Sequence, residues 1–391
     1  KINLPKNIKE RNLYINMGVG EFIERLLIKR PIMFMTDYDR YILRNGQKGY
    51  GGFEKIGTKN ETSPLLLKDY LSYDEMQISS MIAVSSPTHF INEGDRKNKG
   101  YKAPDGLYEE KGVYVGLVGA RFEKPGLMEW AHMIITPEQN TKENGYGPLA
   151  DVRKPKTQLL KLWANFYDQN YFPTYDEACN DESGRYIQIN KTQLLDTKIY
   201  KKRMRMSVEP FLVDANERAV QKGTKAYVHA VGLGLGVWSL SPLQAKLLVD
   251  VYADVIKEIG LLNISDVNFS WFNEDCNDCA GAGNEEILTE AGNNIRIHFS
   301  KRNPAEKLNG KDEGKLLVAC YAWDGNAFPG NEYWAGMLTA SGDPAAACCS
   351  NITELQNPYI NPFVSKEGLR IAGIRGLKKL KNPHVSNGSH I

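Results

Sequence analysis

The fold is decided by the stretch Lys225–Ser241, which reads KAYVHAVGLGLGVWSLS. Its first part, Lys225–Val231, is rich in β-branched and aromatic residues and predicts a buried strand. A turn with glycine at every second position, Gly232–Gly236, follows this strand. Residues Ser241–Gly260 then repeat apolar side chains at a spacing of three or four, which predicts a helix. A strand, a tight turn and a helix in this order predict one unit of an α/β sheet.

Similar segments extend from this unit in both directions. Further strands are predicted at Val113–Arg121, Trp130–Ile135, Asp266–Phe272, Asn294–Phe299 and Lys315–Trp323. Further helices are predicted at Thr157–Tyr167, at Ser207–Gln221 and from Asp343 to Ile352, whereas residues 170–200 are polar and irregular. Strands that alternate with helices predict an α/β fold with a parallel or mixed sheet flanked by helices. In such sheets ligands bind at the carboxyl ends of the strands.

The first hundred residues differ from the rest of the chain. Residues 1–105 are mixed and helix-rich, with an apolar stretch of weak helical spacing at Leu65–Ile91 and a polar loop at Asn92–Gly100. They are predicted to form an accessory or cap region. Residues 106–391 would form the main domain, which ends in a basic tail at 378–381.

The composition is that of a folded protein with a sizeable core, since 42% of the residues are hydrophobic and 25% are charged. The 49 basic residues nearly balance the 47 acidic ones, so neither a nucleic-acid nor a membrane partner is expected. No apolar run approaches the ~20 residues that span a bilayer. The six cysteines lack the dense pattern of a disulfide-rich secreted domain, which favours a reducing, cytosolic compartment.

The glycine-rich turn is the first candidate for ligand binding. Glycines at alternate positions let the backbone approach a ligand closely. Ser241 and Pro242 suit the start of a helix, whose bare amides and dipole favour an anion such as a diphosphate. The residues expected to contact this ligand are Gly232, Gly234, Gly236, Val237 and Trp238. The alternative is a tight turn without a ligand, because the spacing matches neither a Rossmann fingerprint nor a P-loop.

An acidic loop, Asn273–Glu286, follows the predicted strand Asp266–Phe272. Its five carboxylates indicate metal binding, binding of sugar hydroxyls or acid–base chemistry, because clustered acids repel one another. Four of them are candidate catalytic residues: Asp275, Asp278, Glu285 and Glu286. Candidate ligand contacts in the same loop are Asn273, Gly281, Gly283 and Asn284. The alternative is a solvated acidic turn.

Cys276 and Cys279 in the acidic loop have the spacing of a zinc or redox motif. Structural zinc needs about four ligands, and neither a second cysteine pair nor a histidine pair lies at matching spacing. A redox pair would start a helix directly after a strand, which is not the pattern of this loop. We therefore predict no metal site and interpret both cysteines as packing residues.

A third loop follows the hydrophobic strand Lys315–Trp323. It combines flat aromatic side chains with polar ones, as an adenine pocket requires. The residues expected to contact a ligand are Trp323, Asp324, Asn326, Phe328, Asn331 and Glu332. Asp343, which precedes a proline, suits the N-cap of the following helix better than a ligand contact.

Three blocks, Val231–Ser241, Asn273–Glu286 and Ala322–Ser350, resemble a divergent branch of the macrodomain family. That branch consists of arginine-specific ADP-ribosylhydrolases and includes a Legionella effector and its eukaryotic relatives. The resemblance covers about residues 110–375. The chain departs from ordinary macrodomains, which end the key strand in Asn-Ala-Ala-Asn and continue to three glycines. Here the corresponding strand end is Phe269–Asn273.

The resemblance implies a macrodomain-like fold with ADP-ribose in a cleft at the strand ends. It also implies removal of ADP-ribose from arginine of a modified protein, with ubiquitin as that protein and no cofactor. A bacterial effector of this kind would act in the cytosol of its host. The glycine-rich turn would hold the diphosphate, and the adenine would lie beside Trp323, Phe328 or Trp238. The acidic loop would bind the distal ribose, and one of its carboxylates would activate a water at C1″.

Two other functions fit the same loops. A reader module would hold ADP-ribose without cleaving it, and would need the diphosphate and adenine contacts but not several acids. A transferase would prefer NAD to ADP-ribose. The number of carboxylates in the acidic loop favours the hydrolase.

Overall fold

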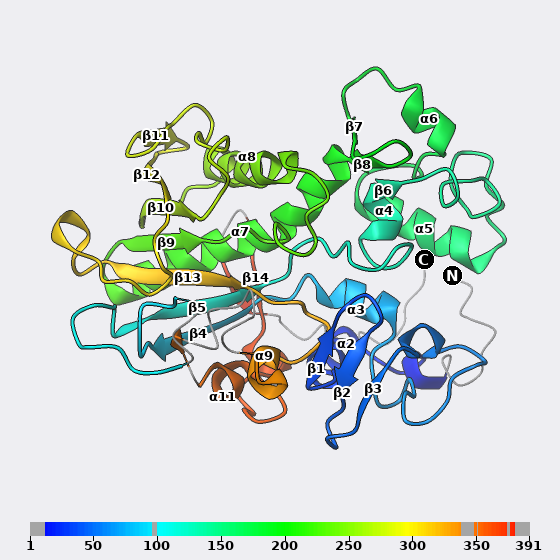
Figure 1. The fold of residues 1–391 in the computed structure, drawn as a ribbon, viewed down its shortest axis with the longest axis horizontal. Helices are drawn as coiled ribbons and strands as arrows, with labels where there is room; N and C mark the ends of the chain where they lie inside the picture. Colours follow the sequence, from blue (N-terminus) through cyan, green and yellow to red (C-terminus); the bar gives the residue numbers. More distant parts are fainter. Residues whose placement is uncertain (1–11, 96–99, 338–347, 350, 374–375, 380–391) are drawn as a thin grey trace, which may run out of the picture.

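A computed structural model of the chain describes residues 12–95, 100–337, 348–349, 351–373 and 376–379. Its centre is a seven-stranded sheet with the order β11-β12-β10-β9-β13-β5-β4 (Figure 1). The five inner strands are parallel, and β11 and β4 are antiparallel edge strands. The bounds are β4 (Val84–His89), β5 (Lys111–Leu117), β9 (Ala226–Ala230), β10 (Ile264–Ser270), β11 (Ile287–Glu290), β12 (Asn293–Ser300) and β13 (Leu316–Ala322). The predicted α/β fold with a mixed sheet flanked by helices is confirmed.

Two long helices, α7 (Thr197–Lys222) and α8 (Leu243–Glu258), cover one face of this sheet (Figure 1). Apolar side chains that alternate along β9 and β10 point into the layer between sheet and helices. Helix α7 begins well before the predicted start at Ser207. The reason is a cap, because the side chain of Asp196 accepts a hydrogen bond from the amide of Ile199.

The opposite face of the sheet carries a second apolar cluster, against which the short helix α11 (Ile352–Gln356) packs. The rings of Tyr114 and Tyr321 meet in this cluster, with their centroids 5.2 Å apart. Gln356 Nε2 donates to the carbonyl of Tyr114 at 2.9 Å and so fixes α11 on the sheet. The predicted helix from Asp343 to Ile352, with Asp343 as its N-cap, lies mostly outside the described residues.

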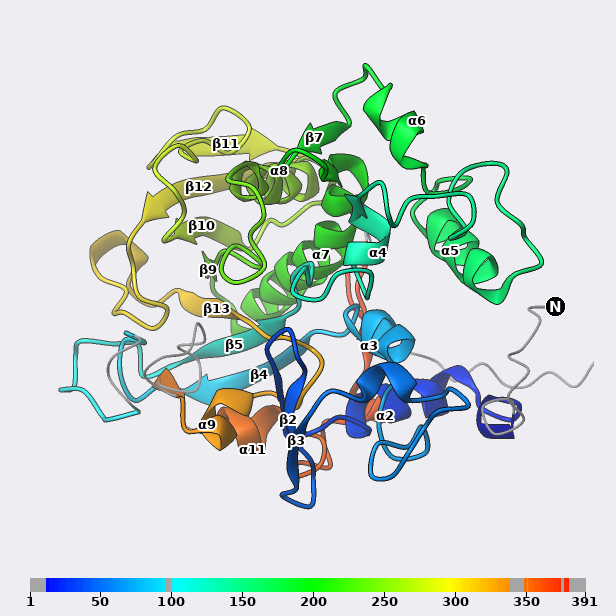
Figure 2. The same ribbon diagram turned by 45° about the vertical axis from the view of Figure 1, so that its right-hand side comes forward.

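Residues 12–79 form what we call the N-terminal layer. It contains α2 (Val19–Ile28), β1 (Met33–Met35), β2 (Arg40–Ile42), β3 (Lys48–Tyr50), η1 (Phe53–Lys55) and α3 (Tyr73–Ser79). Its own apolar cluster includes Met128 and Ala327, which belong to the loops after β5 and β13. The layer therefore packs directly against the carboxyl edge of the sheet, beside α9 (Asn331–Ala335) (Figure 2).

The helical interpretation of Leu65–Ile91 is wrong for its second half. This stretch contains α3 and then β4, so a strand from the predicted accessory region forms an edge of the main sheet. Pro87 lies within β4 and is tolerated because an edge strand does not need every backbone N–H for pairing.

The predicted strand Trp130–Ile135 is also wrong in its first part. It forms the helical turn α4 (Trp130–Met133) and only then the short strand β6 (Ile134–Ile135). The amide of Met133 donates to the carbonyl of Glu129, which closes a helical turn that the apolar composition does not reveal.

The segment between β6 and α7 is more regular than predicted and stands apart from the central sheet in both views (Figure 1, Figure 2). It contains α5 (Pro155–Phe166), α6 (Tyr175–Cys179), β7 (Tyr186–Gln188) and β8 (Leu194–Asp196), with a small sheet β6-β8-β7. The remaining elements are η2 (Gly310–Asp312), η3 (Lys366–Gly368), β14 (Arg370–Ile371) and β15 (Lys378–Lys379). Across the described ranges, no helix combines the length and apolarity needed to cross a membrane.

A buried cluster of two arginines and one glutamate connects the helices to the strand ends. Glu129 accepts hydrogen bonds from Arg121 Nε at 2.8 Å, from Arg121 Nη2 at 2.9 Å and from Arg203 Nε at 3.0 Å. Burial alone would raise the pKa of Glu129, but the two guanidinium groups outweigh it and hold that pKa at about 2. Arg203, on α7, also donates to the carbonyls of Val118 and Gly119. The cluster therefore holds the loop after β5 in place.

Replacement of Glu129 by Gln should lower the free energy of unfolding by about 3–5 kcal/mol, because two buried guanidinium groups lose their counter-charge. Urea unfolding at pH 7 measures this loss. The depressed pKa means that the advantage of wild type over E129Q is fully present above about pH 4.5 and shrinks as the pH falls toward 2.

The control is Glu209→Gln, which removes a partly exposed partner of Arg205 on the surface of α7. It should cost about 0.5 kcal/mol. An E129Q variant as stable as E209Q would show that the buried cluster does not hold the fold together.

Candidate functional site

Parallel neighbours in the sheet end at the same edge, so the loops that follow them meet there. The loops after β5 and β9 touch, since a Cβ atom built on Gly119 would lie 2.8 Å from the amide nitrogen of Gly234. The loops after β5 and β13 also meet, because Arg121 Nη1 donates to Asn326 Oδ1 at 2.6 Å. The loops after β5, β9 and β13 therefore lie side by side at this edge of the sheet. The loop after β5 was not recognised from the sequence.

The glycine-rich turn presents free amide groups. Within the described part of the chain, no acceptor meets the backbone N–H of Gly236, Val237 or Trp238. Gly234 adopts a φ of 71°, which only glycine takes readily. The side chain of Val237 is 85% exposed, so this end of the turn is open to a ligand. A run of free amides is a suitable anion site.

The start of α8 is less open than the sequence predicted. Gln244 Oε1 accepts hydrogen bonds from the amides of Leu240 and Ser241, at 2.6 and 2.9 Å. Ser241 Oγ in turn accepts from the amide of Leu243 at 3.3 Å. The bare helix amides expected for a diphosphate are thus already paired, and the free donors lie earlier, in the turn itself.

The aromatic rings predicted to flank adenine are buried. Trp238, Trp323 and Phe328 are at most 6% exposed. Trp323 Nε1 donates to the carbonyl of Ala327 at 3.1 Å, and the ring of Phe328 stacks on Tyr359. These rings pack inside the loops and leave little exposed surface for contact with an adenine ring.

The acidic loop is held by several separate partners. Asp278 Oδ1 lies 3.3 Å from Lys246 Nζ on α8. Glu285 Oε1 lies 2.8 Å from His298 Nδ1 on β12, and its other oxygen lies 2.6 Å from Lys311 Nζ. The carboxylates of Asp278 and Glu285 are therefore bound to different elements of the scaffold. The pKa of Asp278 is lowered by a hydrogen bond from the amide of Gly281 and by Lys246, and that of Glu285 is lowered by Lys311 and His298.

The other residues predicted in the acidic loop either make hydrogen bonds close to their own position or have no side-chain partner among the described residues. Glu286 accepts from the amide of Gly283 within its own turn at 2.8 Å, and Asn284 Oδ1 accepts from the amide of Phe299 at 2.8 Å. Asp275 and Asn273 are exposed. Asp275 meets no charged partner in the described ranges.

The two cysteines of the acidic loop are packing residues, as predicted. Both are buried, and burial raises the pKa of Cys276 to about 11 and that of Cys279 to about 12. A thiol with so high a pKa is a poor nucleophile and a poor metal ligand. The described residues contain no group of three or more metal-binding side chains.

The loop after β13 carries a carboxyl group with unusual properties. Asp324 is packed on most sides but keeps part of its surface open, and burial together with the nearby Glu332 raises its pKa to about 7. Asn331 Nδ2 donates to Asp324 Oδ2 at 3.2 Å, which favours the charged form. The sequence predicted Asp324, Asn331 and Glu332 as ligand contacts. A carboxyl group with a raised pKa beside a second acid and an amide donor is a candidate for acid–base chemistry.

A third carboxylate, Glu123, approaches this group from the loop after β5. Burial raises its pKa, and the charges of Asp37 and Asp39 in the N-terminal layer raise it further. Glu123 and Asp324 also influence each other electrostatically. Residues far apart in sequence thus bring several carboxylates to one place at the strand ends. Glu123 and Asp37 were not singled out from the sequence.

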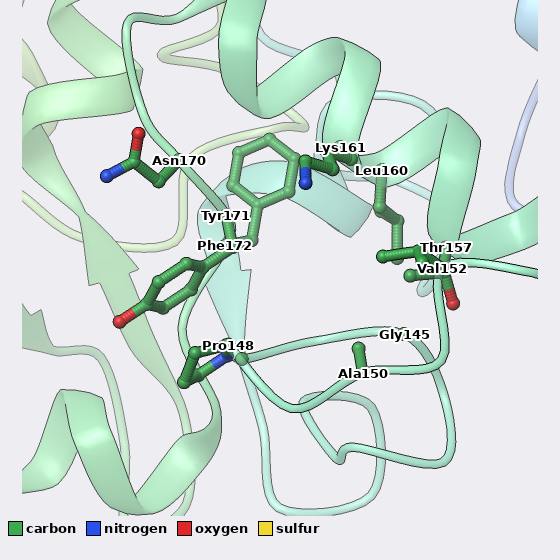
Figure 3. A pocket seen from close by; sticks show the side chains of 11 residues that line it. Gly145, Pro148, Ala150, Val152, Thr157, Leu160, Lys161, Asn170, Tyr171 and Phe172 are labelled. Atoms are coloured by element: carbon green, nitrogen blue, oxygen red, sulfur yellow. The ribbon is translucent and has the colours of Figure 1, made fainter.

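A small cavity of about 60 Å³ lies elsewhere, in the segment between β6 and α7 (Figure 3). Leu160, Phe172 and Lys161 line it together with the turn that contains Gly145 and Gly147. None of the predicted site residues contributes to this cavity. It is too small for a nucleotide, whose binding sites usually enclose several hundred Å³.

Replacement of Glu332 by Gln should lower the pKa of Asp324 below 7, because a neighbouring like charge is removed. Replacement of Asn331 by Ala should raise it, because the carboxylate loses a hydrogen bond. Titration of the ¹³C-labelled carboxyl group by NMR measures both shifts. Glu286→Gln serves as the control and should leave the pKa of Asp324 unchanged. An identical pKa in wild type and E332Q would contradict the pairing.

Comparison with known proteins identifies the family of this chain. A family model described as ADP-ribosylhydrolase MavL-like matches residues 4–383. The ADP-ribosylarginine hydrolase CG2909 of Drosophila melanogaster is 38% identical over 378 residues, which are 94% of this chain and 74% of the relative. The ADP-ribosylarginine hydrolase CG3568 of the same species is 38% identical over 379 residues, 94% of this chain and 73% of the relative. This chain belongs to the MavL-like family of ADP-ribosylhydrolases.

Proposed function

We propose that this chain removes ADP-ribose from arginine side chains of modified proteins. The reaction is hydrolysis of the bond between C1″ of the distal ribose and a guanidino nitrogen. Both Drosophila relatives carry the name ADP-ribosylarginine hydrolase. The single observation that supports the chemistry best is the carboxyl group of Asp324, which lies at a strand end and has a pKa of about 7. A general base works best when its pKa is near the working pH.

Asp324 takes a proton from water while the water oxygen bonds to C1″ and the bond from C1″ to nitrogen breaks. The proton then passes to the departing guanidine. Free ADP-ribose and a protonated arginine side chain leave, and Asp324 returns to its carboxylate form. Glu332 keeps the pKa of Asp324 near neutrality, and Asn331 orients its carboxylate. A positioned general base typically contributes about 10²–10⁴-fold to the rate.

The diphosphate of the ligand would bind to the amides of Gly236, Val237 and Trp238. These donors are consecutive, they meet no acceptor among the described residues, and their turn touches the loop after β5 at Gly234. Backbone amides in such a turn bind phosphate without requiring a basic side chain. The cationic arginine would approach along the carboxylates Glu123 and Asp37, whose negative charge favours a guanidinium group.

The sequence-based assignment of the base to the acidic loop remains the alternative. Asp275, Asp278, Glu285 and Glu286 are the candidates of that assignment. Three of them are held by partners of the scaffold, whereas Asp275 is exposed. Asp324 is favoured because it alone among these acids has a pKa raised to neutrality.

Replacement of Asp324 by Asn should lower kcat about 10²–10⁴-fold on an ADP-ribosylated arginine peptide, because the general base is lost. Wild-type kcat/KM should fall about tenfold for each pH unit below 7, because the protonated carboxyl group cannot act as a base. Release of ADP-ribose, followed by chromatography, measures both effects.

Because the pKa of Asp324 is raised from 3.8 to about 7 on folding, the wild-type carboxylate weakens the fold increasingly between these pH values and fully above about pH 7, so D324N should be at least as stable as wild type at pH 8. Asp278→Asn and Glu285→Gln are matched controls that remove one charge from the acidic loop. They should keep most of the activity. If D278N were inactive and D324N active, the general base would have to be assigned to the acidic loop instead.

We further propose ubiquitin as the modified protein, on the basis of the family resemblance alone. ADP-ribosylated ubiquitin should be hydrolysed with a higher kcat/KM than an ADP-ribosylated arginine peptide, because a protein surface adds binding energy outside the reacting group. Equal values for the two substrates would argue against ubiquitin. Tight binding of ADP-ribose by calorimetry without turnover of either substrate would instead indicate a reader module.

A further inference from the structure

The N-terminal layer holds the loop after β13 at several points. The amide of Phe328 donates to the carbonyl of Pro31 at 3.1 Å, and Ser79 Oγ donates to the carbonyl of Gly325 at 3.3 Å. Ala327 is part of the apolar cluster of the layer and is fully buried. The segment that starts with Trp323 and Asp324 is therefore held from outside the central sheet.

Arg30 lies at the centre of this contact. It occupies the connection between α2 and β1 and is fully buried. Its guanidinium carbon lies 4.5 Å from the centroid of the Trp323 ring. None of its three nitrogens has a hydrogen-bond acceptor in the described part of the chain. Burial, and next the charge of Arg121, lower its pKa to about 9, so it remains cationic at neutral pH.

A buried cation without a counter-charge is unfavourable for stability. Arg25, in the same layer, shows the usual solution, since it pairs with Glu75 at 2.6 Å and donates to the carbonyls of Leu67 and Tyr70. Among the described residues, Arg30 has the face of Trp323 as its one favourable contact for the charge, and such a cation–π contact contributes about 2 kcal/mol when it is desolvated. A buried and unpaired cation at this position therefore indicates a role other than stability.

That role follows from the position of its partner. Trp323 directly precedes Asp324, and its amide donates to the carbonyl of Leu117 at the end of β5. Its indole Nε1 closes the loop on Ala327. The backbone of Trp323 is thus bound to β5 and its ring lies against Arg30, so a tilt of the ring would move the carboxyl group of the next residue.

We infer that Arg30 is a positioning residue of the active site, which acts through the Trp323 ring to fix the Asp324 loop. The N-terminal layer then contributes to the catalytic site by holding the loop after β13, which carries Asp324. This inference rests on the proposed role of Asp324 as general base.

The first experiment compares Arg30→Met, Arg30→Lys and Arg25→Met in the full chain, with an ADP-ribosylated arginine peptide as substrate. R30M should lower kcat about 10–100-fold with little change in KM, since small misplacements of a reacting group have effects of this size. R30K should behave like R30M, because an ammonium group cannot stack flat on the ring. Full activity of R30M, or full rescue by R30K, would overturn the inference.

Thermal unfolding separates positioning from a structural role. R30M should melt at or above the wild-type temperature, because an unpaired buried charge is gone, whereas R25M should melt lower because Glu75 loses its partner. R30M that melts as low as R25M would assign Arg30 to stability and contradict the inference.

Hydrogen exchange read by mass spectrometry tests the same point without turnover. In R30M the amides of Trp323 and Phe328 should exchange faster than in wild type, while R25M should leave them unchanged. Unchanged exchange in R30M would overturn the inference. If wild type does not release ADP-ribose but R30M shows faster exchange at these amides, the proposed function fails and the coupling of Arg30 to the loop stands.

Discussion

The site depends on the carboxylate of Glu129, which is shared between two buried arginines. Through Arg203 it connects helix α7 to the loop after β5, and through Arg121 it connects that loop to Asn326 after β13. A buried ion cluster is favourable only when every partner is in place, so these loops are held in one arrangement. Because the Asp324 loop is one of them, the geometry of the proposed base is set before a substrate binds.

The central sheet could largely be predicted from residue patterns, and its exceptions have physical causes. Strands β9, β10 and β13 are rich in apolar residues and are followed by glycine-rich or polar loops, a pattern typical of buried parallel strands. The stretch Trp130–Ile135 is equally apolar but too short to separate a strand from a helical turn. Strand β4 was not predicted because Ser85, Ser86 and Pro87 are unusual strand residues, and only pairing with β5 stabilises them.

The site was predicted less completely than the fold. Asp324, Asn331 and Glu332 were predicted as ligand contacts because polar residues gather at a strand end, but the raised pKa of Asp324 depends on burial that no pattern shows. The same limit applies to Trp323 and Phe328, which were expected beside adenine and are packed inside. The sequence shows where aromatic rings and carboxylates occur along the chain, but it does not show which of them are buried or hydrogen-bonded in the folded protein.

Residues of the N-terminal layer were left out of the predicted site for a related reason. Arg30 and Asp37 are far from the strand ends in sequence and carry no motif. Their proximity to the site results from the packing of the layer on the loops after β5 and β13. Predicting it would have required the long-range contacts of the folded chain.

A crystal structure of the D324N variant with ADP-ribose bound tests the central claim most directly. We expect the diphosphate on the amides of Gly236–Trp238 and the distal C1″ within about 3–4 Å of a water that contacts residue 324. A distal ribose bound against the acidic loop Asn273–Glu286, with residue 324 out of reach of any water near C1″, would contradict it.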